Sequence, residues 1–334
     1  MSTSDGSKHG RGLRALLVLL LLAGAMIGLG LVLLRGCADP QPVTVRAIAA
    51  GGMVCDPNDP EFNEGAGTKD GCRHQETSDA ALARNADALL GLGDYQYEIP
   101  DADSYTQIYG PSWGRMRDVT IPAIGNQEYK VHKANTFRDY FGDRAGPETG
   151  YWATTLGTWR IVLLNSNCTT VQGGCAEGSP QWNWLAGELA GNPARCTLAL
   201  WHHPRWSNGI AGADARTADL VGLLADRGVD IGLAAHEADY ERFRPMTGDG
   251  HPAGKGIRTF VVGTGGQAVY EPAVGDAAWR AKQSSPGSEH FDGAHHGFLE
   301  LVLAPGSYEW MFHAVGAGPD GETAVTDRGD AQCS

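Results

Sequence analysis

Four apolar, strand-like runs of this sequence each end at a polar residue, and this pattern constrains the fold more than any other feature. "ADALLGLGD" ends at Asp94, "VTIPAIGN" at Asn126, "CTLALWHHP" runs into His202, and "VDIGLAAHE" into His236. Helix-like segments such as "SPQWNWLAGELAGN" lie between the strand-like runs. Alternating strands and helices predict an α/β fold, and open α/β sheets bind ligands beyond the carboxyl ends of their strands.

The four polar residues are therefore expected to converge on one site, and their types indicate a metal. Asp94 offers a carboxylate that can bridge two ions, Asn126 an amide oxygen, and His202 and His236 imidazole nitrogens. One carboxylate, one amide and two imidazoles suit Zn, Fe or Mn better than Ca²⁺ or Mg²⁺.

Six motifs, taken in order, resemble those of the metallophosphoesterases, also called calcineurin-like phosphoesterases. The resemblance is strongest to bacterial purple acid phosphatase-like members and covers residues 43–334. The motifs are "GDYQY" (93–97), "GNQE" (125–128), "WHHP" (201–204), "HEADYER" (236–242), "VVGTGG" (261–266) and "GFLELVLAPGSYEWMF" (297–312). The resemblance implies a four-layered α/β/β/α sandwich with mixed sheets and a two-metal centre at the strand ends.

The resemblance also implies a role for each matching residue. The second metal site would take Asp94, Asn126, His202 and His236, all of which are present. The first site would share Asp94 and take Tyr97. Two further residues, His203 and Tyr240, are expected to support these ligands without binding the metal.

Three positions depart from the family pattern at the places where its chemistry is done. Gly52 stands where the family has a metal-binding Asp, and Ala238 replaces the second His of its His-x-His pair. Gln127 replaces a His that contacts the phosphate and helps to protonate the leaving group. Because two protein ligands rarely hold a transition metal tightly, we expect one metal ion per chain rather than two.

Three functions are compatible with this pattern. The first is a metallophosphoesterase-fold protein with a degraded first metal site and weak or no phosphatase activity. The second is an active phosphomonoesterase or phosphodiesterase that uses one metal or recruits a second with its substrate. The third is a pseudo-phosphatase that binds a phosphorylated or cell-envelope ligand.

The N-terminus is expected to anchor the protein in the cell membrane. Residues 15–34 carry no charge, are long enough to cross a bilayer as a helix, and follow Lys8, Arg11 and Arg14. This predicts a cytoplasmic tail (1–14), a transmembrane signal anchor (15–35), a linker (36–42) and an exported domain (43–334). A cleaved signal peptide and lipidation of Cys37 remain alternatives.

Cysteine usage fits export to an oxidising compartment. Apart from Cys37, six cysteines remain, an even number without the Cys-x-x-Cys spacing of zinc sites. The short loops suggest Cys55–Cys72 and Cys168–Cys175, which leaves Cys196 with Cys333.

The charge of the chain restricts its partners. The formal net charge is −13, and nucleic-acid binding would require clustered Lys and Arg. A phosphate ester or phosphorylated ligand is still compatible, since a local site can oppose the global charge. The sequence names no protein partner.

Overall fold

The structure, a computed structural model, describes residues 43–334 except 69–70, 271–284 and 319–320. The expected tail (1–14), membrane anchor (15–35) and linker (36–42) lie outside the described residues. Within the described ranges, no helix has the length and apolarity needed to cross a membrane. Val43–Ser334 forms one compact unit.

One mixed sheet contains six strands in the order β13-β12-β11-β1-β2-β3. β1 runs parallel to β2, and β2 to β3, whereas β11, β12 and β13 are antiparallel to their neighbours. The parallel part therefore places the carboxyl ends of β1, β2 and β3 at one edge. The strands span Val45–Ala50 (β1), Ala88–Gly91 (β2), Thr120–Pro122 (β3), Gly297–Ala304 (β11), Ser307–Ala314 (β12) and Ala324–Gln332 (β13).

The other mixed sheet contains seven strands in the order β10-β8-β9-β7-β6-β5-β4. Its centre is parallel, from β5 through β6 and β7 to β9. The strands span Trp152–Leu156 (β4), Trp159–Leu163 (β5), Thr197–Leu200 (β6), Ile231–Ala234 (β7), Tyr240–Phe243 (β8), Arg258–Val262 (β9) and Ser288–Asp292 (β10).

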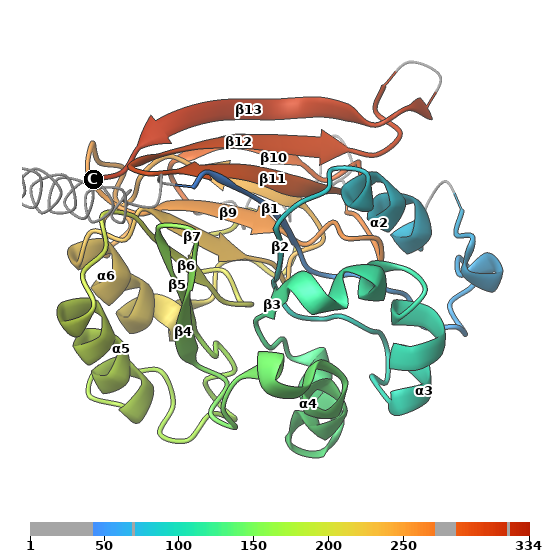
Figure 1. Ribbon diagram of the computed structural model, residues 1–334, viewed down its shortest axis with the longest axis horizontal. Coiled ribbons are helices and arrows are strands. Elements are labelled where there is room, and N and C mark those ends of the chain that lie inside the picture. The colour runs from blue at the N-terminus through green and yellow to red at the C-terminus, as the bar shows by residue number, and fades with distance from the viewer. Residues whose placement is uncertain (1–42, 69–70, 271–284, 319–320) are drawn as a thin grey trace, which may run out of the picture. The chain divides into compact units, whose positions relative to one another are not determined.

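Helices α5 and α6 lie beside the seven-stranded sheet, and α2, α3 and α4 lie on the side of β1, β2 and β3 (Figure 1). The α-helices are α2 (His74–Leu82), α3 (Ala102–Ser104), α4 (Asn135–Phe141), α5 (Pro180–Gly191) and α6 (Ala218–Asp226). A π-helical turn, η2, spans Tyr105–Tyr109. The 3₁₀ turns are η1 (Asn63–Gly65), η3 (Trp113–Val119), η4 (Gln127–Lys130), η5 (His132–Ala134), η6 (Gly142–Ala145) and η7 (Ala215–Thr217).

Three hydrophobic cores lie between the layers of sheets and helices. Along β1, Ala47 and Ala49 point into the core between the sheets, whereas Ile48 and Ala50 point into the core beneath α2 and α4. This alternation follows from the two-residue period of a strand. A third core joins the other sheet to α5 and α6. The described domain is thus a mixed α/β sandwich with two mixed sheets, as expected for a metallophosphoesterase fold.

Local signals explain several element boundaries. Ser179 Oγ accepts a hydrogen bond from the Trp182 amide at 3.2 Å, and Pro180 follows at the first helical position, so α5 begins where expected. The segment "TSDAALARNADALLG" predicts a helix capped at Thr77 or Ser78, and this prediction was wrong. The helix begins earlier, at His74, and the Thr77 hydroxyl donates to the Arg73 carbonyl at 2.8 Å from within the helix.

All three expected disulfides are formed. Two of them close short loops, with separations of 17 and 7 residues, and the third joins residues 137 apart. The pairs are Cys55–Cys72, Cys168–Cys175 and Cys196–Cys333. The long-range bond attaches the end of β13 to the start of β6, and so joins the two sheets.

Candidate metal centre

Four polar side chains from the ends of four strands meet around one nitrogen atom. His202 Nε2, after β6, lies 3.2 Å from Asp94 Oδ2, 3.0 Å from Asn126 Oδ1 and 3.2 Å from His236 Nδ1. Asp94 follows β2, Asn126 follows β3, and His236 follows β7. The structure therefore brings together the four residues that the sequence places at the second metal site.

The donor set fits a single transition-metal ion. His202 Nδ1 lies 2.7 Å from the Leu92 carbonyl, which can only accept, so Nδ1 carries a hydrogen and the neutral ring presents its Nε2 lone pair to the cluster. Asp94 Oδ2 and Asn126 Oδ1 are also acceptors. A cation among these atoms would be shared by all of them, and histidine ligands in metal sites characteristically donate their other N–H to a carbonyl or carboxylate.

Asp94 is fixed by its neighbours. Asp94 is 1% exposed and has φ +55°, a conformation that is uncommon for residues other than glycine. The Gln127 amide donates to Oδ1 at 2.9 Å, and the Tyr97 hydroxyl donates to Oδ2 at 2.7 Å. Tyr97 therefore contacts the cluster through Asp94.

The buried carboxylate of Glu128 holds two loops of this site together. The sequence alone indicated no such role for it. Glu128, 1% exposed, accepts the backbone amides of Asp94 (3.0 Å), Tyr95 (3.0 Å) and Gly125 (2.8 Å). It thereby fixes the loop after β2 against the loop after β3. Burial and the negative charge of Asp94 raise the pKa of Glu128 to about 7.

The charges of the cluster are strongly coupled. Burial opposes the ionised form of Asp94, but the adjacent His202 ring and several hydrogen bonds hold the pKa of Asp94 well below its usual range. Burial opposes protonation of His202, yet Asp94 raises the pKa of that ring. Burial and the neighbouring rings lower the pKa of His236 to about 4 and that of His203 to about 2.

Of the three positions that depart from the expected pattern, Gln127 contacts the cluster, through its backbone amide on Asp94 Oδ1. Gly52 has φ +59°, and a β-carbon there would stand 2.6 Å from the Gly263 carbonyl oxygen. The Ala238 carbonyl accepts the Tyr270 amide at 2.8 Å. Gln127 is 8% exposed, and its buried Oε1 has no hydrogen-bond partner among the residues that the structure describes.

Two further polar residues after β5 support the site. Ser166 Oγ accepts the backbone amides of His202 (3.2 Å) and His203 (2.9 Å), and lies 2.9 Å from His203 Nδ1. Asn167 Nδ2 reaches the Gly125 carbonyl at 3.3 Å. Sequence reasoning assigned no role to either, although "LLNSN" follows the same rule of an apolar run ending in polar residues.

Tyr240, expected to support the ligands, makes its described contacts elsewhere. Its hydroxyl donates to Asp327 Oδ2 at 2.7 Å, and its ring stacks on Phe312 at 3.9 Å. The structure therefore gives Tyr240 a role in joining β8 to the other sheet. His203 does lie at the cluster, with its ring centre 4.4 Å from that of His236.

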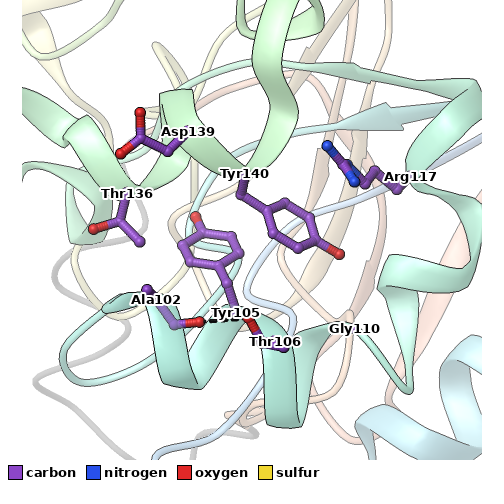
Figure 2. Close-up of a pocket in the computed structure, with 8 residues that line it drawn as sticks. All are labelled: Ala102, Tyr105, Thr106, Gly110, Arg117, Thr136, Asp139 and Tyr140. Carbon is purple, nitrogen blue, oxygen red and sulfur yellow. Dashed lines mark hydrogen bonds between the residues drawn. The ribbon is translucent and has the colours of Figure 1, made fainter.

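A separate pocket of about 500 Å³ lies between η2 and α4 (Figure 2). Figure 2 shows the ring of Tyr140 between Tyr105 and Arg117, whose guanidinium carbon lies 5.0 Å from the Tyr140 ring centre. The Tyr105 hydroxyl is buried and has no hydrogen-bond partner within the described ranges. Among the 8 labelled lining residues Asp139 is the one acid, and none is a histidine.

Comparison with solved structures identifies the fold. A purple acid phosphatase, PPD1, from yellow lupin (Lupinus luteus) seeds is 18% identical with a TM-score of 0.64, over 87% of this chain and 54% of that one. PhoD is 12% identical (TM-score 0.58), over 87% of this chain and 70% of that one. The Plasmodium inner-membrane-complex anchor GAP50 is 13% identical (TM-score 0.56), over 87% and 89%.

These likenesses show that the chain has the metallophosphoesterase fold. The chain spans about half of the length of the lupin phosphatase. No protein-family model matches the sequence, and no curated protein matches it.

Proposed function

We propose that this chain is a metallophosphoesterase-fold protein that holds one transition-metal ion, Zn, Fe or Mn, and binds phosphate esters with weak or no turnover. The observation that carries the proposal is the convergence of Asp94, Asn126 and His236 on His202 Nε2, within 3.2 Å. An ion bound there would supply a Lewis acid for a phosphoryl oxygen.

The surroundings of Gly52 support one ion rather than two. A carboxylate at this position would have to displace the Gly263 carbonyl, which lies 2.6 Å from the position of the missing β-carbon. Ala238 offers no ligand atom in its side chain. Tyr97 and Asp94, the remaining candidates for a first site, already hydrogen-bond each other at 2.7 Å.

Gln127 supports weak turnover. The family histidine at this position contacts the phosphate and helps to protonate the leaving group. A carboxamide does not titrate near neutral pH, so Gln127 can hydrogen-bond a bound phosphate but cannot act as a general acid. The protein would therefore retain the capacity to bind a phosphate ester and lose most of the capacity to cleave it.

The preserved framework favours a binding role, as in a pseudo-phosphatase for a phosphorylated or cell-envelope ligand. Glu128 fixes the ligand loops through three backbone amides, and Asn167 fixes the Gly125 loop from the other side. Preorganised ligands favour tight binding whether or not chemistry follows.

The site would act outside the cytoplasm. We propose that residues 15–35 anchor the chain in the cell membrane as a single span, with residues 43–334 exported. Three formed disulfides support an oxidising compartment for the domain.

Metal content tests the proposal. The full-length chain, purified in detergent without chelator or added metal, should contain one transition-metal ion per chain. His202→Ala should remove it, whereas His251→Ala, which deletes an exposed imidazole, should retain it. Two ions per chain would contradict the proposal.

Turnover provides the second test. With p-nitrophenyl phosphate and a phosphodiester analogue, the metal-loaded protein should show little hydrolysis while still binding inorganic phosphate. Efficient, His202-dependent hydrolysis would establish instead an active phosphomonoesterase or phosphodiesterase that works with one metal or recruits a second.

A further inference from the structure

Two neighbouring histidines at the centre have opposite hydrogen-bond environments. His202 Nδ1 lies 2.7 Å from the Leu92 carbonyl, so it donates there and leaves its Nε2 lone pair for the cluster. His203 Nδ1 lies 2.9 Å from a hydroxyl oxygen, Ser166 Oγ. A hydroxyl can donate or accept, so the other contacts of Ser166 decide the direction of this bond.

Those contacts make Ser166 the donor. Its Oγ already accepts two backbone amides, from His202 at 3.2 Å and from His203 at 2.9 Å. These amides occupy the two lone pairs of the hydroxyl, and its own hydrogen is directed to the remaining neighbour, His203 Nδ1. Because Nδ1 accepts, the hydrogen of the neutral His203 ring is on Nε2.

His203 is therefore a hydrogen-bond donor at the centre and not a metal ligand. A histidine that binds metal characteristically donates its other N–H to a carbonyl or carboxylate, as His202 does and His203 does not. Nitrogen atoms of His202, His203 and His236 nevertheless lie within 4.8 Å of one another. In the described part of the chain, His203 Nε2 has no hydrogen-bond partner.

We propose that His203 donates its Nε2 hydrogen to an oxygen of the phosphate group bound at the centre. This inference rests on the proposed function. It assigns to His203 the phosphate contact that the family resemblance places at position 127, where Gln127 now stands. The ligand class is a tetrahedral phosphate, free or as a monoester, with one oxygen directed at this ring.

The tautomer of His203 tests the first half of the inference in the unaltered protein. Two-bond ¹H–¹⁵N NMR spectra of the metal-free full-length chain, assigned with His203→Gln, should show the Nε2–H form for His203. His202 should show a hydrogen on Nδ1. A His203 ring with its hydrogen on Nδ1 would overturn the inference.

Phosphate binding tests the second half. In the metal-loaded protein, His203→Ala should weaken inorganic phosphate binding by about 10- to 100-fold, the effect of losing a hydrogen bond to a charged group. Metal content should stay at one per chain. His203→Gln, whose amide can still donate, should retain more affinity than His203→Ala.

The outcomes separate this inference from the proposed function. If the unaltered protein holds no metal, the proposed function fails. If it holds metal and binds phosphate but His203→Ala binds equally well, the assignment of His203 is wrong. Loss of the metal in His203→Ala would also overturn the assignment, since the ring would then be a ligand. If His203→Ala does not fold, His203→Gln and the tautomer measurement decide.

Discussion

The carbonyl oxygen of Gly263 lies 2.6 Å from the position that a β-carbon on Gly52 would occupy. Gly52 also has φ +59°, which disfavours any residue with a side chain. The strand ends of β1 and β9 therefore meet backbone to backbone at the position where the family carries a metal-binding carboxylate.

Gly52→Asp should consequently destabilise the protein without creating a second metal site. The left-handed conformation and the contact with Gly263 together should lower the free energy of unfolding by about 2–4 kcal/mol. Urea denaturation and metal content measure the two effects. Gly178→Asp is the control, since Gly178 also has a positive φ, +79°, and no atom within 4 Å of its β-carbon position. If both variants lose the same free energy of unfolding, the contact with Gly263 does not contribute to the destabilisation of Gly52→Asp.

Glu128→Gln should weaken both the fold and the metal centre. The carboxylate accepts three backbone amides, and a carboxamide has only one acceptor atom. The free energy of unfolding should fall by about 2–4 kcal/mol. Metal affinity should fall at least about tenfold, because Asp94 and Asn126 lose their common support. Glu98→Gln, which alters an exposed ion pair with Lys130, should change stability by less than about 1 kcal/mol and leave metal affinity unchanged.

The two disulfides with the most different loop lengths should differ in their contribution to stability. Chain entropy predicts a loss of about 5 kcal/mol for the double Cys→Ser variant of Cys196 and Cys333, whose separation is 137 residues. The same model predicts about 2.5 kcal/mol for Cys168 and Cys175, separated by 7 residues. Urea denaturation of both variants checks the order. If removing Cys168–Cys175 lowers stability more than removing Cys196–Cys333, chain entropy is not the main contribution of these disulfides to stability.

Asp327 should stabilise the protein in a pH-dependent manner. It accepts hydrogen bonds from Tyr240 and from Arg242 Nε, both at 2.7 Å, across the two sheets. Burial opposes its charge, but the bonds from Arg242 and Tyr240 lower its pKa below 3.8. Its contribution is therefore complete above pH 3.8 and is lost as the pH falls through the lower, folded-state pKa.

Asp327→Asn should accordingly lower the free energy of unfolding by about 1–3 kcal/mol at pH 7, with a smaller difference below about pH 4. Urea denaturation at pH 7 and pH 3 measures this change. Asp330→Asn, at an exposed position of the same strand, should have little effect at either pH. If Asp327→Asn lowers the free energy of unfolding as much at pH 3 as at pH 7, the stabilisation does not come from the charge of Asp327.

The sequence predicts the parallel centre of each sheet well, because strands such as β6 and β7 are short apolar runs followed by a distinctive polar residue. It does not reveal β8, β10 or β13. β13, with the sequence "AVTDRGDAQ", is an edge strand on which Arg328 and Asp330 are exposed and the charged Asp327 is buried, so it lacks the apolar alternation that marks a half-buried strand.

At the site, residue types and strand ends were sufficient to place Asp94, Asn126, His202 and His236 together. The supporting contacts were not predictable, since they depend on tertiary structure. The Leu92 carbonyl that orients His202 lies 110 residues away, and the Ser166 hydroxyl lies 36 residues away. A buried glutamate that anchors backbone amides, such as Glu128, is indistinguishable in sequence from a solvated one.

The hydroxyl of Ser166 has a consequence for how related sequences should vary. Its oxygen accepts two backbone amides and lies 2.9 Å from His203 Nδ1, and we infer that its hydrogen fixes the tautomer of that ring. In an alignment of close relatives, position 166 should therefore covary with position 203 and only weakly with the four ligand positions. Where residue 203 is not histidine, selection no longer requires a hydroxyl hydrogen at position 166, and residues that merely accept the two amides should replace serine.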